Sequence, residues 1–184
     1  TEEPVSEADV AAVLAAAQAC SSSNLQQVTS IIRVTDPAKR ARLAELAGNQ
    51  PYVASAPEFW VFVGDNRRHS LMVPGARLGW TEQLLVAGLD TGIMMQGAMN
   101  ALEALGLGGV FIGGLRTNAA AVDELLELPP NAFVVNALAF GHPARRPGVK
   151  PRMPSSLVFM ENSYRDPDPE VLRGYDEGTL AAYY

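Results

Sequence analysis

The sequence predicts an α+β domain or a three-layer α/β/α sandwich, because strand and helix patterns follow one another without a regular repeating unit. Apolar runs rich in β-branched and aromatic residues predict strands at residues 28–34, 58–63, 110–112, 133–140 and 157–160. Helical patterns cover residues 7–19, 39–47, 84–105 and 118–128, with a helical turn around 52–56. The 184 residues, 48% of them apolar, suffice for one domain with a sizeable core, or for one subunit of an intertwined oligomer.

Polar residues mark where several of these helices begin. Ser6 and Asp9 form a capping-box pattern ahead of the first helix. Asp36 can cap the second helix, and Pro37 suits a first helical position because its fixed φ is already helical. Asn118 is expected to cap the helix over 118–128.

The most apolar stretch, residues 84–105, is predicted to be a helix rather than a membrane span, because polar residues interrupt it. Gln96, Asn100 and Glu103 follow helical spacing and form one narrow polar stripe. We therefore expect a helix buried on most sides. Gly92 and Gly97 allow another backbone to come close, which suits a central helix or a subunit interface.

Composition narrows the possible partners. A net charge of −6 argues against nucleic acid, which is normally met by a basic surface. The single cysteine, Cys20, permits no internal disulfide, fits a reducing cytoplasm and is expected to be a packed thiol. His69 and His142 lack a partner at ligand spacing, so no metal site is expected. No signal peptide is apparent.

Three features suit ligand binding, and each has a plainer interpretation. Residues 21–27 offer hydroxyls and amides just after a helix, or they are only a solvated helix exit. Gly113 and Gly114 let a flat ligand approach the backbone, or they form a tight turn. Lys150 and Arg152 are set among prolines and can meet an anion, or they belong to a solvated loop.

Other motifs are incomplete. The glycines that begin at residue 106 do not form a dinucleotide fingerprint, because Phe111 stands where the third glycine is required. Leu115 and Arg116 occupy the positions that a phosphate loop needs for Lys and Ser or Thr. No nucleophile elbow is present, and Cys20 has no evident base nearby in sequence. The sequence thus indicates binding features rather than a set of catalytic side chains.

The order of these segments resembles the oxygen-insensitive NADPH nitroreductases and flavin reductases of the major, group A type. The resemblance runs over nearly the whole chain, through residues 21–23, 30–36, 58–62, 106–116, 150–154 and 161–164. It implies the nitroreductase fold: an α+β three-layer sandwich with a mostly antiparallel sheet and a long buried helix. It also implies a homodimer that holds FMN at the subunit interface, with residues 1–184 as a single domain.

Carried over by position, the resemblance implies a set of ligand contacts. Ser22 and Gln50 would contact FMN, and Phe111, Ile112, Gly113 and Gly114 would lie along the flavin edge near N5. Lys150 and Arg152 would face its pyrimidine edge and phosphate. Asn24 and Leu25 would lie beside the substrate. No side chain need act as a catalytic group, because the flavin transfers the hydride.

The implied reaction moves hydride from NADPH through FMN to a nitroaromatic, a quinone or free flavin, the two substrates taking turns at one flavin face. The family's basic segment for the FMN phosphate is expected before Thr1, and its NADPH-contacting C-terminal segment after Tyr184, so the chain is interpreted as truncated at both ends. Two other interpretations stay open at this point: a flavin-binding or interaction domain without turnover, and an acidic scaffold without cofactor.

Overall fold

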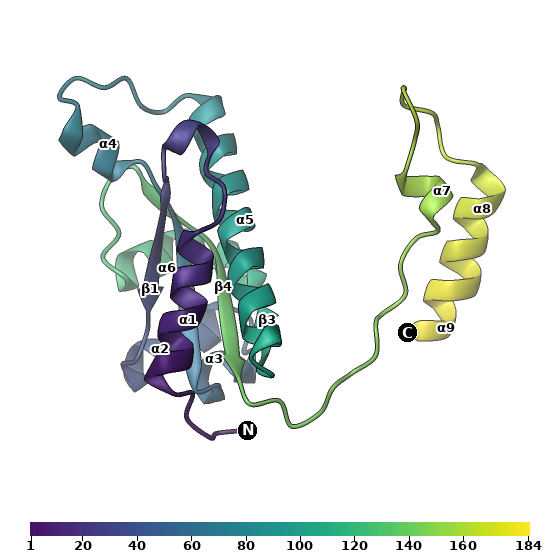
Figure 1. The fold of residues 1–184 in the computed structure, drawn as a ribbon, viewed down its shortest axis with the longest axis horizontal. Coiled ribbons are helices and arrows are strands. Elements are labelled where there is room, and N and C mark those ends of the chain that lie inside the picture. The colour runs from purple at the N-terminus through teal and green to yellow at the C-terminus, as the bar shows by residue number, and fades with distance from the viewer. The chain divides into compact units, whose positions relative to one another are not determined.

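The computed structural model describes residues 1–184 as two units, Thr1–Ala144 and Arg145–Tyr184. The first unit is built on a four-stranded sheet of β1 (Thr29–Arg33), β2 (Glu58–Asp65), β3 (Gly108–Phe111) and β4 (Ala132–Gly141). The strands lie in the order β1-β2-β4-β3, and every neighbouring pair is antiparallel (Figure 1). Four of the five predicted strands are therefore confirmed, as is the antiparallel sheet.

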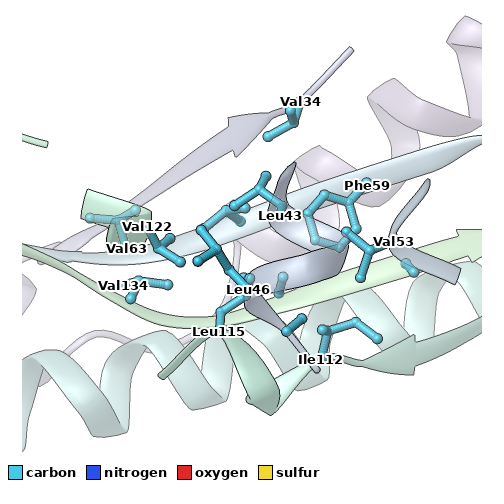
Figure 2. Close-up of a cluster of buried hydrophobic side chains, with 14 residues drawn as sticks. Val34, Leu43, Leu46, Val53, Phe59, Val63, Ile112, Leu115, Val122 and Val134 are labelled. Atoms are coloured by element: carbon cyan, nitrogen blue, oxygen red, sulfur yellow. The ribbon is translucent and has the colours of Figure 1, made fainter. Parts of the chain in front are cut away.

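Side chains of β2 alternate between the two faces of the sheet and divide the core in two. Phe59, Val61 and Val63 face a cluster that contains residues of α2 (Pro37–Leu46), α3 (Pro51–Ser55) and α6 (Ala119–Leu125), shown in Figure 2. Trp60 and Phe62 face a second cluster with residues of α1 (Glu7–Gln18) and α5 (Thr81–Ala104). The unit is thus a three-layer sandwich, as predicted, with helices on both faces of the sheet.

The predicted helix starts are confirmed at α1 and α2. The Ser6 hydroxyl accepts a hydrogen bond from the Asp9 backbone N–H at 3.1 Å. The Asp36 carboxylate accepts from the backbone N–H groups of Ala38 and Lys39, and Pro37 is the first helical residue. Such caps supply partners for backbone N–H groups that have no partner within the helix, and each cap stabilises the protein by about 1 kcal/mol.

The prediction for the start of α6 was wrong. Asn118 makes no capping bond; its side-chain amide donates instead to the Leu46 carbonyl at 2.8 Å, at the end of α2. A 3₁₀ helix over Gly113–Asn118 precedes α6, so the chain enters the helix already wound and needs no cap there. Asn118 therefore ties two helices of the same layer together.

Helix α5 has one buried face and one exposed face in the single chain. Met95, Ala98 and Leu102 are buried, whereas residues 84, 85, 89 and 93, all Leu or Ile, are between 45% and 58% exposed. The expected burial on most sides is thus only partly realised. Gly97 lies where an added Cβ would be 2.1 Å from the Cys20 Sγ, so this glycine allows α1 and α5 to pack closely. No helix is long and apolar enough to span a bilayer.

The second unit contains no strand, which corrects the prediction for residues 157–160. Its segment Ser155–Val158 forms a short helix, α7, in which the Phe159 N–H donates to the Ser155 carbonyl at 2.8 Å. Pro154, at φ −52°, directs the chain into that turn, so the local bond replaces strand pairing. The tail then forms α8 (Pro169–Arg173), a π-helical segment (Gly174–Leu180) and α9 (Ala181–Tyr183), where the sequence indicated only one terminal helix.

Candidate functional site

The glycine-rich segment directly follows β3, as the sequence predicted. Ile112 is fully buried in the cluster of Figure 2, and its N–H donates to the Ala137 carbonyl at 2.8 Å. Leu115, also fully buried, anchors the other side of the segment. Gly113 and Gly114 lie between these two anchors and are partly exposed. The backbone of the two glycines is therefore held rigidly at the surface.

Gly114 lies directly against the residue that leads into α3. A Cβ on Gly114 would lie 2.5 Å from the Ala47 carbonyl oxygen and 2.9 Å from the Gln50 side-chain nitrogen. The Gln50 amide donates to that same carbonyl at 3.0 Å, which fixes its position. The structure thus brings Gln50 and Gly114, two of the predicted cofactor residues, into one place. Only glycine leaves this contact intact.

The serine-rich segment is tied to α5. The Ser22 hydroxyl donates to Asp90 Oδ2 at 2.8 Å and accepts from the Gln27 N–H at 2.7 Å. The Ser23 hydroxyl and N–H both donate to the Asp90 carboxylate, at 2.7 and 2.9 Å. This arrangement leaves Leu25, a predicted substrate residue, 80% exposed.

Asp90 is one of the polar residues that interrupt the apolar stretch of residues 84–105, and no function was predicted for it from the sequence. A carboxylate within an otherwise apolar helix needs hydrogen-bond donors from elsewhere in the chain. This requirement is the feature of the sequence that could have indicated a role for Asp90. The structure supplies those donors from residues 22 and 23, with Asp90 only 4% exposed.

Lys150 and Arg152 belong to the second unit, and both side chains are exposed. Arg152 Nη1 donates to the backbone carbonyls of Lys150 and Pro151, at 3.1 and 3.0 Å. This folding back shortens the reach of the guanidinium and restricts its motion. Neither residue is in a salt bridge within the chain, so both charges are available to an anion.

The groups with shifted pKa values lie in structural contacts elsewhere. Hydrogen bonds from Arg33 lower the pKa of Glu7, and its bonds to Glu7 and Glu58 raise the pKa of Arg33 itself. Burial lowers the pKa of Arg40, which donates to the Val53 carbonyl at 2.8 Å and lies over the Phe59 ring. Ion pairing and burial account for these shifts without a catalytic role.

A groove of about 550 Å³ runs along the exposed face of α5. Its apolar wall comes from α5 and from residues 133–135 at the start of β4, and Arg116 also lines it. Gly88 and Gly92 on α5 have no atom within 4 Å of an added Cβ, so the helix backbone is open to a close neighbour. No group of three or more His, Cys, Asp or Glu side chains gathers where it could hold a metal ion.

Comparison with known proteins finds one family and several close relatives. Residues 1–142 match the model of the Nitroreductase family. The chain is 50% identical to an oxygen-insensitive NADPH nitroreductase of Salmonella typhimurium, and 46% identical to an NADPH-flavin oxidoreductase of Vibrio harveyi, covering all of this chain and 76% of each relative.

Solved structures give the same result. The nitroreductase A of Vibrio parahaemolyticus superposes with a TM-score of 0.96 at 45% identity, covering all of this chain and 78% of that one. An NADPH:FMN oxidoreductase of Vibrio harveyi, solved in complex with NAD+, also gives a TM-score of 0.96, at 46% identity, with 80% of that chain covered.

Proposed function

Because the chain belongs to the Nitroreductase family, we propose that it is an FMN-dependent oxidoreductase that uses NADPH to reduce nitroaromatics, quinones or free flavin. The observation that carries this proposal is the match of the whole chain to an NADPH nitroreductase and an NADPH-flavin oxidoreductase. FMN, when bound, accepts hydride from NADPH and passes it to the acceptor. The free thiol of Cys20 supports a reducing, cytoplasmic setting.

The protein's part in this chemistry is to bind and orient. We assign Gln50, Gly113 and Gly114 to one edge of the flavin, since the bare glycine backbone admits a flat ring and the Gln50 amide lies next to it. Phe111 and Ile112 support that edge from β3 and the core. Ser22 contributes its hydroxyl, and exposed Asn24 and Leu25 border the acceptor.

Lys150 and Arg152 are assigned to the pyrimidine edge and phosphate of FMN. This assignment rests on the family resemblance and on their chemistry, because two exposed cations set among prolines suit an anionic ligand. A cation beside the pyrimidine edge also favours the negative charge that reduction places there. The chemistry of these two cations therefore fits the anionic parts of FMN.

The proposed activity has a direct test. We expect the purified protein, supplied with FMN, to be yellow and to lose its flavin absorbance when NADPH is added without oxygen. A nitroaromatic or quinone added next should restore the colour. Colour that persists after NADPH would instead indicate a flavin-binding domain without turnover. A protein that stays colourless with FMN would indicate a scaffold and contradict the proposal.

We further propose that the chain forms a homodimer through the groove along α5. Four exposed Leu and Ile side chains and two open glycines on one helix face are suited to a second copy, because that contact removes apolar surface from water. Such a dimer also agrees with the expectation from length and composition that the chain can be one subunit of an intertwined oligomer.

Leu89→Arg is expected to disrupt this dimer. The side chain is 56% exposed in the single chain, so the change should leave the fold intact while placing a charge in the interface. We expect the dimer dissociation constant to rise by at least about 100-fold, measured by sedimentation or light scattering. Leu14→Arg on α1, a site 38% exposed and outside the groove, is the matched control. Equal masses for both variants and the unmodified protein would contradict the interface.

A further inference from the structure

We propose that Asp90 is a positioning residue that holds residues 22–27 in the conformation needed to present Ser22 to FMN and Leu25 to the electron acceptor. The proposal rests on the proposed function for the identity of these ligands. The new proposal goes beyond that function by assigning a role to a buried residue of α5 that contacts the site only through Ser22 and Ser23.

The first support is the environment of the carboxylate. Asp90 is 4% exposed, and a buried carboxylate is unfavourable unless donors surround it. Its three donors are the Ser22 hydroxyl, the Ser23 hydroxyl and the Ser23 N–H, at 2.7 to 2.9 Å. Because every one of them belongs to the serine segment, Asp90 and this segment hold each other in place.

The second support is the backbone of the segment itself. Asn24, Leu25 and Gln27 have φ values of 49°, 55° and 52°, in the left-handed region that residues other than glycine rarely adopt. Such a conformation persists only where surrounding contacts impose it. The bonds to Asp90 precede these three residues, and the bond from the Gln27 N–H to Ser22 closes the loop behind them. The Asp90 contacts therefore anchor a strained turn.

The same bonds determine what Ser22 can offer a ligand. Its proton is committed to Asp90 Oδ2, and it already accepts from the Gln27 N–H. A hydroxyl has one donor and two acceptor positions, so Ser22 can only accept from a ligand. The geometry thus pairs Ser22 with a donor group of FMN, such as a ribityl hydroxyl or a ring N–H, and excludes an unprotonated phosphate oxygen or a carbonyl oxygen.

A neighbouring residue provides a matched control for a purely structural effect. Thr91 follows Asp90 on α5, is fully buried, and its hydroxyl forms a 2.9 Å hydrogen bond with Thr29. Thr91→Val removes a buried polar contact of the same helix without touching residues 22–27. Substitution of either residue can lower the stability of the protein as a whole. A change in the conformation of residues 22–27 should follow only from substitution of Asp90.

The experiment compares Asp90→Ala, Asp90→Asn and Thr91→Val by amide hydrogen exchange without FMN, by FMN titration, and by steady-state kinetics with NADPH and a quinone acceptor. For Asp90→Ala we expect exchange in residues 22–27 to accelerate by about tenfold or more, and the FMN dissociation constant and the acceptor KM to rise by about tenfold. Asp90→Asn should stay near the unmodified protein, because its oxygen can accept from Ser22 and the Ser23 N–H while its amide donates to a turned Ser23 hydroxyl. Thr91→Val should change none of these three quantities.

The outcomes separate this proposal from the proposed function. Exchange requires no cofactor, so unchanged exchange in residues 22–27 of Asp90→Ala overturns the positioning role even if the protein is an active reductase. Faster exchange with unchanged FMN affinity and acceptor KM overturns the link to the ligand site. If Asp90→Ala does not fold, the double variant Ser22→Ala and Ser23→Ala removes both hydroxyl donors from the segment side, and the same exchange measurement decides.

Discussion

Gly114→Ala should lower the stability of the protein by about 2 kcal/mol and weaken FMN binding by about tenfold or more. The added Cβ would lie 2.5 Å from the Ala47 carbonyl oxygen, far inside van der Waals contact. That carbonyl ends α2 and accepts the Gln50 amide, so neither partner can move without disturbing the other. Relief of the clash must displace Gln50 or the glycine backbone, which are both assigned to the flavin edge.

Gly113→Ala is the matched comparison. A Cβ there would meet Arg116 Nη2 at 3.0 Å, the far end of a flexible, exposed side chain that can move away at the cost, at most, of its exposed hydrogen bond to the Val135 carbonyl. We therefore expect a much smaller loss of stability than at Gly114. Thermal unfolding without FMN and titration with FMN measure the two effects separately. Equal losses for the two variants, or no loss at Gly114, would contradict the contact between Gly114 and Gln50 as the basis of the site.

The double variant Lys150→Ala and Arg152→Ala should bind FMN about 100-fold more weakly, since bonds from cations to an anionic ligand are among the stronger hydrogen bonds. Stability without FMN should hardly change, because both side chains are exposed and neither is in a salt bridge within the chain. FMN titration at several salt concentrations measures the effect, and the variant should show a weaker dependence on salt.

A second double variant controls for net charge. Arg145→Ala with Arg146→Ala also removes two positive charges, from the same basic stretch of the sequence. If general attraction of the anion were the cause, both double variants would bind FMN equally weakly. We expect the second to remain within a few-fold of the unmodified protein. Unchanged affinity and turnover after substitution of Lys150 and Arg152 would overturn their assignment to FMN.

Local chemistry accounts for the elements that sequence analysis predicted well. Runs such as residues 58–63 have few alternatives to a buried strand, because aromatic and β-branched side chains fill both faces of a sheet. Ser6 and Asp36 begin helices through bonds that span only a few residues. The segment at 157–160 was misjudged for the converse reason: a strand needs a neighbouring strand, and none lies in its unit.

For the candidate site, too, the sequence predicted individual residues but not the contacts between them. Sequence and family resemblance predicted Ser22, Gln50, Gly113 and Gly114 as site residues, although none of them is distinctive alone. The cause of their arrangement was not visible in the sequence, because it depends on contacts between residues distant along the chain. The contact of Gly114 with Ala47 and Gln50, and the bonds from Ser22 and Ser23 to Asp90, are of this kind.

The sequence by itself determined the four strands of the sheet, the starts of α1 and α2 and the long apolar helix, and its resemblance to known sequences indicated the family. The strands and helices depend on side-chain periodicity or on short-range hydrogen bonds, which a linear pattern records. Only the tertiary structure decided which face of α5 is buried, why residue 114 must be glycine, and what Asp90 holds. These properties depend on steric exclusion and on partners for buried charge, and both exist only once distant segments have packed together.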